Sequence, residues 1–320
     1  MNCVRVTAAA RLHLGFLDLN GGLGRRFGSI GLSVDAFATE VRLRESASFS
    51  VAGEERERGA RLALRFADAH GLGAAKALTV ARAIPAHAGL GSGTQLALAI
   101  AAALRRMNGL PLDAGADARL LDRGERSGVG AALFERGGLI VDAGRGATTK
   151  LPSVVARLQF PHRWRAVLVL ERRAQGAHGE TERNAFAALP IFPAASAAEI
   201  CRLTLMQILP GVAEQDIAAF GAGVQRLQEI VGDYFAPVQG GGRFTSAAVG
   251  RMMERLKAKG AHGIGQSSWG PTGFAFAADE SEAELLAKEA RAHIEPGMEV
   301  IVSKALNAGA LIEGDGGSPS

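Results

Sequence analysis

The sequence predicts a two-domain α+β protein, and three observations lead to this prediction. The chain has 320 residues, which is enough for about two domains and a sizeable core. Each half mixes strand patterns with helix patterns, which indicates α+β packing instead of a uniform parallel sheet. Glycines and prolines interrupt the pattern between residues 145 and 160. We therefore expect an N-terminal domain over 1–155, a C-terminal domain over 156–312 and a disordered tail over 313–320.

In the first half, local patterns set the expected elements. Residues 33–44 alternate between apolar and polar over much of their length, which is typical of a strand. Residues 94–107 contain no Gly or Pro and are rich in helix formers, and Asn108-Gly109 marks their end. Asn20-Gly21-Gly22 predicts a turn. The expected strands are 3–10, 30–44, 46–52 and 78–84; the expected helices are 60–69, 94–107 and 117–126; a hairpin is expected over 134–142.

The second half is expected to open with a buried strand over 164–170 and to continue with helices to about residue 232. Ser246 begins a helix that Gly260 ends. A strand over 274–277, a helix over 280–292 and a strand over 298–304 complete this half.

Two glycine-rich loops stand out. The first loop, residues 85–95, carries Gly89, Gly91 and Gly93 and leads directly into the strong helix. Glycine lets the backbone bend tightly and lets a ligand approach it closely. The free N–H groups and the dipole of the helix then form an anion site, for which phosphate is the obvious ligand. The second loop covers residues 263–273. A tight turn without a ligand is the alternative interpretation of such a loop.

Composition narrows the class of protein. Hydrophobic residues make up 48% of the chain, and the longest apolar run, residues 96–104, is too short to cross a bilayer. We therefore expect no membrane association and a cytoplasmic location, with Cys3 and Cys201 reduced. The chain has 30 arginines and only 6 lysines, which suits an anionic substrate but also fits codon bias. The basic residues are dispersed and aromatic residues make up 5%, which argues against nucleic-acid binding.

Four segments together resemble one known family. The first glycine-rich loop resembles the phosphate loop Pro-x-x-x-Gly-Leu-Gly-Ser-Ser of the GHMP small-molecule kinases, but it continues Gly93-Thr94-Gln95 where those kinases continue with serine or alanine. With the other segments in the same order, the chain resembles the β-ribofuranosylaminobenzene 5′-phosphate synthase family, a branch of the GHMP superfamily. The four segments are 11–25, 87–95, 123–130 and 265–272.

The resemblance implies a fold and a reaction. The fold is of the GHMP-kinase type, with a ribosomal-protein-like N-terminal domain and a ferredoxin-like C-terminal domain. The enzyme is a decarboxylating phosphoribosyltransferase of tetrahydromethanopterin biosynthesis. It joins phosphoribosyl pyrophosphate to 4-aminobenzoate or 4-hydroxybenzoate, releases CO2 and pyrophosphate, and leaves a C-glycosidic bond. Mg2+ is the implied ion, ATP is not a substrate, and a homodimer is the family expectation.

The same resemblance supplies candidate site residues. Asp18 is expected to bind magnesium or to face the cation that develops at the sugar C1 atom, and Arg25 to grip pyrophosphate or the benzoate carboxylate. With them, His13 is placed in the catalytic group, although a structural histidine is an even alternative. Residues expected to bind substrate are Arg11, His87, Gly89, Gly91, Ser92, Gly93, Thr94, Gln95, Arg123, Arg126, Ser127, Gly265, Gln266, Ser267, Ser268, Trp269 and Thr272.

Two other functions compete with this one. A GHMP small-molecule kinase would bind ATP and transfer a phosphoryl group, but Gly93-Thr94-Gln95 departs from the kinase loop. A nucleic-acid-binding module would show steeply salt-dependent RNA binding. The sequence leaves open which benzoate is preferred, which loop holds which phosphate, and whether His13 and His87 are functional.

Overall fold

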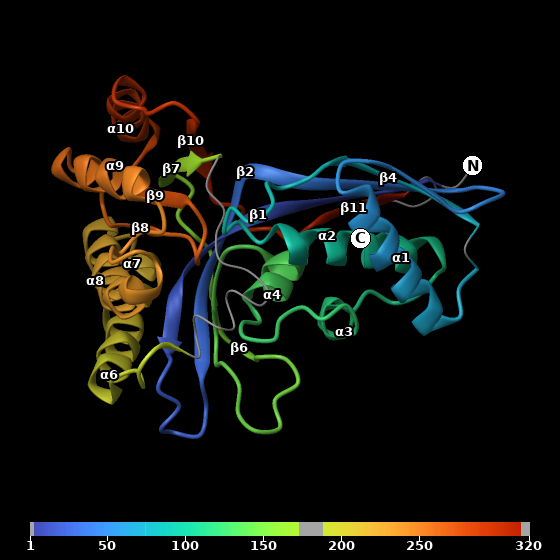
Figure 1. Cartoon of the computed structure of the whole chain (residues 1–320), viewed down its shortest axis with the longest axis horizontal. Coiled ribbons are helices and arrows are strands. Elements are labelled where there is room, and N and C mark those ends of the chain that lie inside the picture. Colours follow the sequence, from blue (N-terminus) through green and yellow to red (C-terminus); the bar gives the residue numbers. More distant parts are fainter. Residues whose placement is uncertain (1–2, 74, 173–187, 315–320) are drawn as a thin grey trace.

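The computed structural model describes residues 3–73, 75–172 and 188–314. Two β-sheets lie side by side, each with its own helices (Figure 1). The seven-stranded sheet contains β1 (Cys3–Asp18), β2 (Phe27–Glu45), β3 (Ser50–Gly53), β4 (Lys76–Arg82), β5 (Leu139–Asp142), β6 (Val154–Leu158) and β11 (Leu311–Gly314). The four-stranded sheet contains β7 (Arg165–Glu171), β8 (Ile264–Gln266), β9 (Thr272–Ala277) and β10 (Met298–Lys304).

The long hairpin of β1 and β2 forms the centre of the seven-stranded sheet. Along its length β2 pairs with β1, and its other edge pairs with β4 towards one end and with β5 towards the other. Helix α2 packs on β1 and β2 and is buried almost throughout. The helices of this half are α1 (Arg56–His70), α2 (Ser92–Met107), α3 (Ala114–Leu120) and α4 (Val129–Arg136).

The second sheet has the strand order β10-β7-β9-β8 and is antiparallel throughout. This order, with helices after β7 and β9, is the ferredoxin-like arrangement that the family resemblance implied. Alternate residues of β7 face opposite sides: Val167 and Val169 pack with α9 and α10, whereas Leu168 and Leu170 pack with α8. The helices are α6 (Ala194–Leu203), α7 (Leu209–Ala213), α8 (Ile217–Phe235), α9 (Ala247–Ala258) and α10 (Glu280–Ala292). A π-helical turn, Thr204–Ile208, joins α6 to α7, and a 3-10 turn, Ala236–Val238, follows α8.

Three local predictions were wrong. Residues 11–18, expected between strands, extend β1 to Asp18, because their alternation continues through buried Leu12 and Leu14. The helix expected over 117–126 is α3, which Asp113 caps and which ends at Leu120. The hairpin expected over 134–142 is the end of α4 followed by β5; Gly137 and Gly138, both at positive φ, end the helix.

The expected domain boundary and the expected tail do not coincide with the ends of the sheets. The expected boundary at residue 155 falls inside β6, which belongs to the first sheet, so the change of sheet comes between Leu158 and Arg165. The expected tail begins inside β11, which pairs antiparallel with β1. Residues 315–320 of that tail lie outside the described residues. Among the helices that the structure describes, none is long and apolar enough to cross a membrane.

Candidate active site

The two glycine-rich loops pack against each other and against β1. A Cβ atom at Gly89 would lie 2.1 Å from the carbonyl oxygen of Ser267, and one at Gly270 would lie 2.2 Å from the carbonyl oxygen of Ala88. Backbone therefore meets backbone where the loops cross, and glycine is required by this contact. We call the meeting of residues 11–13, 88–91 and 267–272 the loop junction.

Side chains of the loop junction bond to its own backbone. The Ser267 hydroxyl donates to the Gly89 carbonyl over 2.7 Å and accepts from the His13 N–H over 3.0 Å. The Thr272 hydroxyl donates to the Ala88 carbonyl over 2.7 Å, and an Arg11 Nη1 atom donates to the Gly89 carbonyl over 2.8 Å. These three residues were predicted to bind substrate, and each bonds to the backbone of the first loop, so they fix its shape.

The departure from the kinase loop has a packing explanation. A Cβ atom at Gly93 would lie 2.3 Å from an Arg58 Nη2 atom, so this guanidinium occupies the space that a serine side chain would need. Gln95 donates from Nε2 to the carbonyl of Gly130 over 3.0 Å, and Thr94 contacts the same glycine. Thr94 and Gln95 therefore join α2 to α4. Arg58 was not among the predicted site residues, because no local pattern links α1 to a loop 35 positions away.

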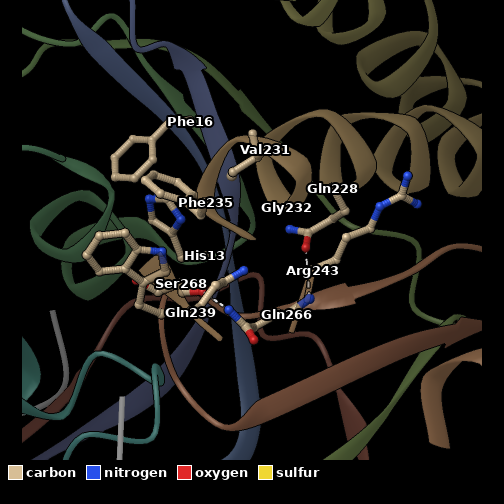
Figure 2. A pocket seen from close by; sticks show the side chains of 12 residues that line it. His13, Phe16, Gln228, Val231, Gly232, Phe235, Gln239, Arg243, Gln266 and Ser268 are labelled. Atoms are coloured by element: carbon tan, nitrogen blue, oxygen red, sulfur yellow. Dashed lines mark hydrogen bonds between the residues drawn. The ribbon is translucent and has the colours of Figure 1, made fainter. Parts of the chain in front are cut away.

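An aromatic pocket opens beside the loop junction (Figure 2). The rings of His13 and Phe16 lie 4.7 Å apart, edge to face, and those of Phe235 and Trp269 lie 4.6 Å apart in the same manner. Such walls suit a flat aromatic ligand. The polar groups among its lining residues come from Gln228, Gln239, Arg243, Gln266 and Ser268. Among the lining residues, His13 and Phe16 come from β1 and Gln228 and Phe235 from α8, so both halves of the chain contribute.

Two of these glutamines hold the pocket wall. The Gln228 amide donates to the Leu14 carbonyl and accepts from the Gln266 N–H, and Gly265 leaves room for it. Gln266 in turn donates to the Ser268 carbonyl over 2.9 Å. Gly265 and Gln266, predicted as ligand groups, therefore support the wall that presents Ser268 and Trp269.

His13 is a neutral ring. Its residue is 3% exposed, and burial, followed by the positive charge of Arg11, lowers the pKa of His13 from 6.5 to about 3. A ring with this pKa is a weak base at neutral pH. His13 therefore contributes packing and hydrogen bonding in the pocket more readily than proton abstraction.

The low pKa of His13 predicts a pH-dependent stability. Between pH 6.5 and 3 the unfolded chain takes up a proton at this histidine and the native chain does not, so stability falls as the pH falls. We expect the free energy of unfolding to drop by about 2 kcal/mol between pH 7 and pH 5 for this group. Denaturant unfolding at both pH values should show this drop in wild type and its loss in His13→Gln. The exposed His162→Gln variant should keep it, and equal drops in wild type and His13→Gln would contradict the assignment.

Asp18 and Arg25 do not line the aromatic pocket with His13. Asp18 ends β1, five residues beyond His13, or about 16 Å along an extended strand. An Asp18 oxygen accepts the N–H groups of Asn20 and Gly21 and so holds the turn between β1 and β2. The exposed Arg25 donates to the carbonyls of Ala143 and Gly144. The three residues predicted as one catalytic group are therefore divided between the pocket and this turn, and the roles of Asp18 and Arg25 stay predictions.

The other predicted ligands flank the start of α2 and α4. Ser92 is the first residue of α2. His87 lines an open hollow together with Arg58. Arg123 lies near Gly93, and Arg126 precedes Ser127, which donates to Asp142 over 3.2 Å. The start of α2 therefore gathers several of the predicted anion ligands outside the aromatic pocket.

Buried Asp142 organises the turn that precedes α4. One carboxylate oxygen accepts the N–H of Gly128 over 2.9 Å, and the other accepts the N–H of Gly144 over 2.8 Å. Burial raises the pKa of Asp142, while these hydrogen bonds oppose the rise. Its partners account for both oxygens, so we interpret it as a positioning residue.

The described residues do not form a magnesium cage of their own. Among the described residues, no three His, Cys, Asp or Glu side chains lie together as a metal site. Magnesium usually binds through one or two carboxylates together with substrate phosphates. We therefore assign no chemical step to an ion held by this chain.

Comparison with known proteins first defines the class. The GHMP kinases N terminal domain model matches residues 58–138, and the GHMP kinases C terminal model matches residues 208–296. The structure resembles homoserine kinase from Cytophaga hutchinsonii, with a TM-score of 0.69, 17% identity and 97% of each chain covered. It also resembles mevalonate diphosphate decarboxylase from Staphylococcus aureus, with a TM-score of 0.69, 13% identity and 98% of each chain covered. The predicted two-domain GHMP-kinase-like fold is thus confirmed.

Closer relatives define the family within that class. The chain is 36% identical to the beta-ribofuranosylphenol 5′-phosphate synthase of Archaeoglobus fulgidus, over 97% of this chain and 99% of the relative. It is 31% identical to the enzyme of that name from Methanothermobacter thermautotrophicus, over 96% of this chain and 98% of the relative. The protein belongs to the β-ribofuranosylphenol 5′-phosphate synthase family of the GHMP superfamily.

Proposed function

We propose that the protein joins phosphoribosyl pyrophosphate to 4-hydroxybenzoate as a decarboxylating phosphoribosyltransferase of methanopterin biosynthesis. The observation that carries the proposal is the full-length identity of 36% with a beta-ribofuranosylphenol 5′-phosphate synthase. Three relatives carry ribofuranosylphenol in their names, which favours 4-hydroxybenzoate over 4-aminobenzoate as the acceptor. The aromatic pocket beside a phosphate-loop-type helix start supports the pairing of an arene with a phosphorylated sugar.

The reaction makes one carbon–carbon bond and breaks two bonds. The C1–oxygen bond to pyrophosphate breaks and leaves positive charge at C1. The ring carbon that bears the carboxylate attacks C1, and the electron pair of the bond to the carboxylate then returns to the ring as CO2 leaves. No proton is removed from that carbon, so the weak basicity of His13 is compatible with the reaction. What the site must supply is orientation of two substrates and stabilisation of the departing anion.

The contacts suggest different roles for the pocket residues and for the loop junction. His13, Phe16 and Trp269 would hold the arene between aromatic edges and faces. Through the hydrogen bonds of Ser267 and Arg11, the loop junction would fix the position of the first loop relative to the pocket. In this proposal magnesium arrives with the pyrophosphate and not on a preformed protein cage. Asp18 as an additional ion ligand, and a homodimeric assembly, remain predictions.

Release of labelled CO2 tests the proposal. The purified protein is mixed with 4-hydroxybenzoate labelled with carbon-14 at the carboxylate, phosphoribosyl pyrophosphate and Mg2+, with 4-aminobenzoate in parallel. We expect labelled CO2 only when the sugar donor is present, and faster release from 4-hydroxybenzoate. No release from either acceptor, together with consumption of ATP in the presence of a small alcohol, would move the assignment to a kinase.

A further inference from the structure

Two guanidinium groups lie over the first turn of α2. Arg58 comes from α1, and Arg123 comes from the segment after α3. A Cβ atom at Gly93 would lie 2.3 Å from Arg58 Nη2 and 3.3 Å from Arg123 Nη1. Gly93 does not have a positive φ, so its backbone conformation is open to other residues and only the space is restricted. Gly93 therefore lets the two cations approach the helix start.

The pair carries positive charge that its neighbours only partly balance. Burial, followed by the charge of Arg58, lowers the pKa of Arg123, and the Nε atom of Arg123 is buried without a hydrogen-bond partner in the described chain. Asp122 lies near Arg123 but is hydrogen-bonded to Arg65, and Glu55 contacts Arg58 only at 3.8 Å. The carboxylates of Glu55 and Asp122 are thus shared among the guanidinium groups of Arg58, Arg65 and Arg123. A bound anion would relieve the repulsion between Arg58 and Arg123.

We propose that Arg58 and Arg123, brought together by Gly93 at the first turn of α2, bind the pyrophosphate group of the sugar donor. The assignment rests on the proposed function. Pyrophosphate is the more highly charged end of the donor, and negative charge grows on it as the C1–oxygen bond breaks. Guanidiniums bind such oxygens bidentately, and the helix dipole adds to their effect. Arg58 and Arg123 would therefore stabilise the leaving group.

Calorimetric titration with inorganic pyrophosphate in a magnesium buffer tests the assignment without turnover. We expect Arg58→Gln and Arg123→Gln to bind pyrophosphate about tenfold to a hundredfold more weakly than wild type. Gly93→Ala keeps every charge but displaces Arg58, and it should also weaken binding. Titrations with ribose 5-phosphate and with 4-hydroxybenzoate should be unchanged in the Arg58→Gln variant. Arg119→Gln, an exposed arginine on α3, should match wild type throughout.

Melting temperature separates binding from a structural role. Without ligand, Arg123→Gln should melt at or above the wild-type temperature, because it removes a partly buried charge beside another; loss of a structural arginine would lower the melting temperature. Unchanged pyrophosphate affinity in Arg58→Gln, or weakened ribose 5-phosphate binding with unchanged pyrophosphate binding, would overturn the assignment. Failure of wild type to release CO2 would refute the proposed function alone, since pyrophosphate binding is measured independently.

Discussion

Replacement of Gly89 by alanine is expected to abolish CO2 release and to lower the free energy of unfolding by about 3 kcal/mol or more. Gly89 has a φ of +78°, and a Cβ atom there would lie 2.1 Å from the Ser267 carbonyl oxygen and 2.9 Å from the Gly270 Cα atom. Both neighbours are backbone, so no side chain can rotate away. The two loops would have to separate, and the hydrogen bond from Ser267 to the Gly89 carbonyl would be lost with them.

Two further alanine variants separate the clash from the backbone strain. Gly270 does not have a positive φ, but a Cβ atom there would lie 2.2 Å from the Ala88 carbonyl oxygen, so Gly270→Ala tests the clash alone. Gly109 has a φ of +66° with nothing within 4 Å, so Gly109→Ala tests the strain alone and should cost about 1 kcal/mol. Unfolding and CO2 release are measured for all three. Wild-type turnover in Gly89→Ala would show that the loop junction is not needed for catalysis.

The sequence identified the important loops but not what their glycines contact. Absence of a Cβ atom shows that something approaches the backbone closely, and it does not show whether a ligand or another loop does so. In the structure Gly89 meets Gly270, and the hydroxyls of Ser267 and Thr272 bond to carbonyls of the first loop. The bonded residues are 178 and 184 positions apart in the sequence, so no local pattern could indicate that they are in contact.

Element ends were predictable where a local cap defined them. Asp279 caps α10 by accepting the Glu282 N–H, and the predicted range 280–292 agrees with α10. Ser246 caps α9 in the same way, by accepting the Val249 N–H. By contrast, α4 is 8 residues long and begins at Val129, and its N-cap residue Gly128 has no side chain to cap it, so its sequence offered no start signal. Tertiary contacts, not local propensity, stabilise such a short helix.

The site itself required long-range information. The burial that makes His13 neutral comes from packing, and no local pattern predicts it. Arg58 reaches Gly93 only because α1 packs against α2. A family resemblance transferred Asp18 and Arg25 together with His13, yet of these three only His13 is among the residues that line the pocket.

Replacement of Asp142 by alanine is the second change with a large expected effect. The buried carboxylate accepts the N–H groups of Gly128 and Gly144, and alanine would leave both donors without an acceptor. Each unsatisfied buried donor costs about 1–3 kcal/mol, so we expect a loss of about 3 kcal/mol or more in unfolding free energy. Asp142→Asn should lose less, because its amide oxygen still accepts one bond. Asp113→Ala removes one exposed helix cap and should cost about 1 kcal/mol.

The effect of Asp142 should also reach catalysis through α4. Gly128 lies at the start of α4, and Gln95 of α2 bonds to the Gly130 carbonyl two residues further on. If the start of α4 shifts, the first turn of α2 shifts with it, whereas the aromatic pocket lies on β1 and α8. We therefore expect Asp142→Asn to raise the KM for phosphoribosyl pyrophosphate by about tenfold and to leave the KM for 4-hydroxybenzoate unchanged. A displacement confined to α2 should affect only the KM for phosphoribosyl pyrophosphate. Equal increases in both KM values would therefore contradict an effect passed from α4 to α2 and would indicate a general loss of structure.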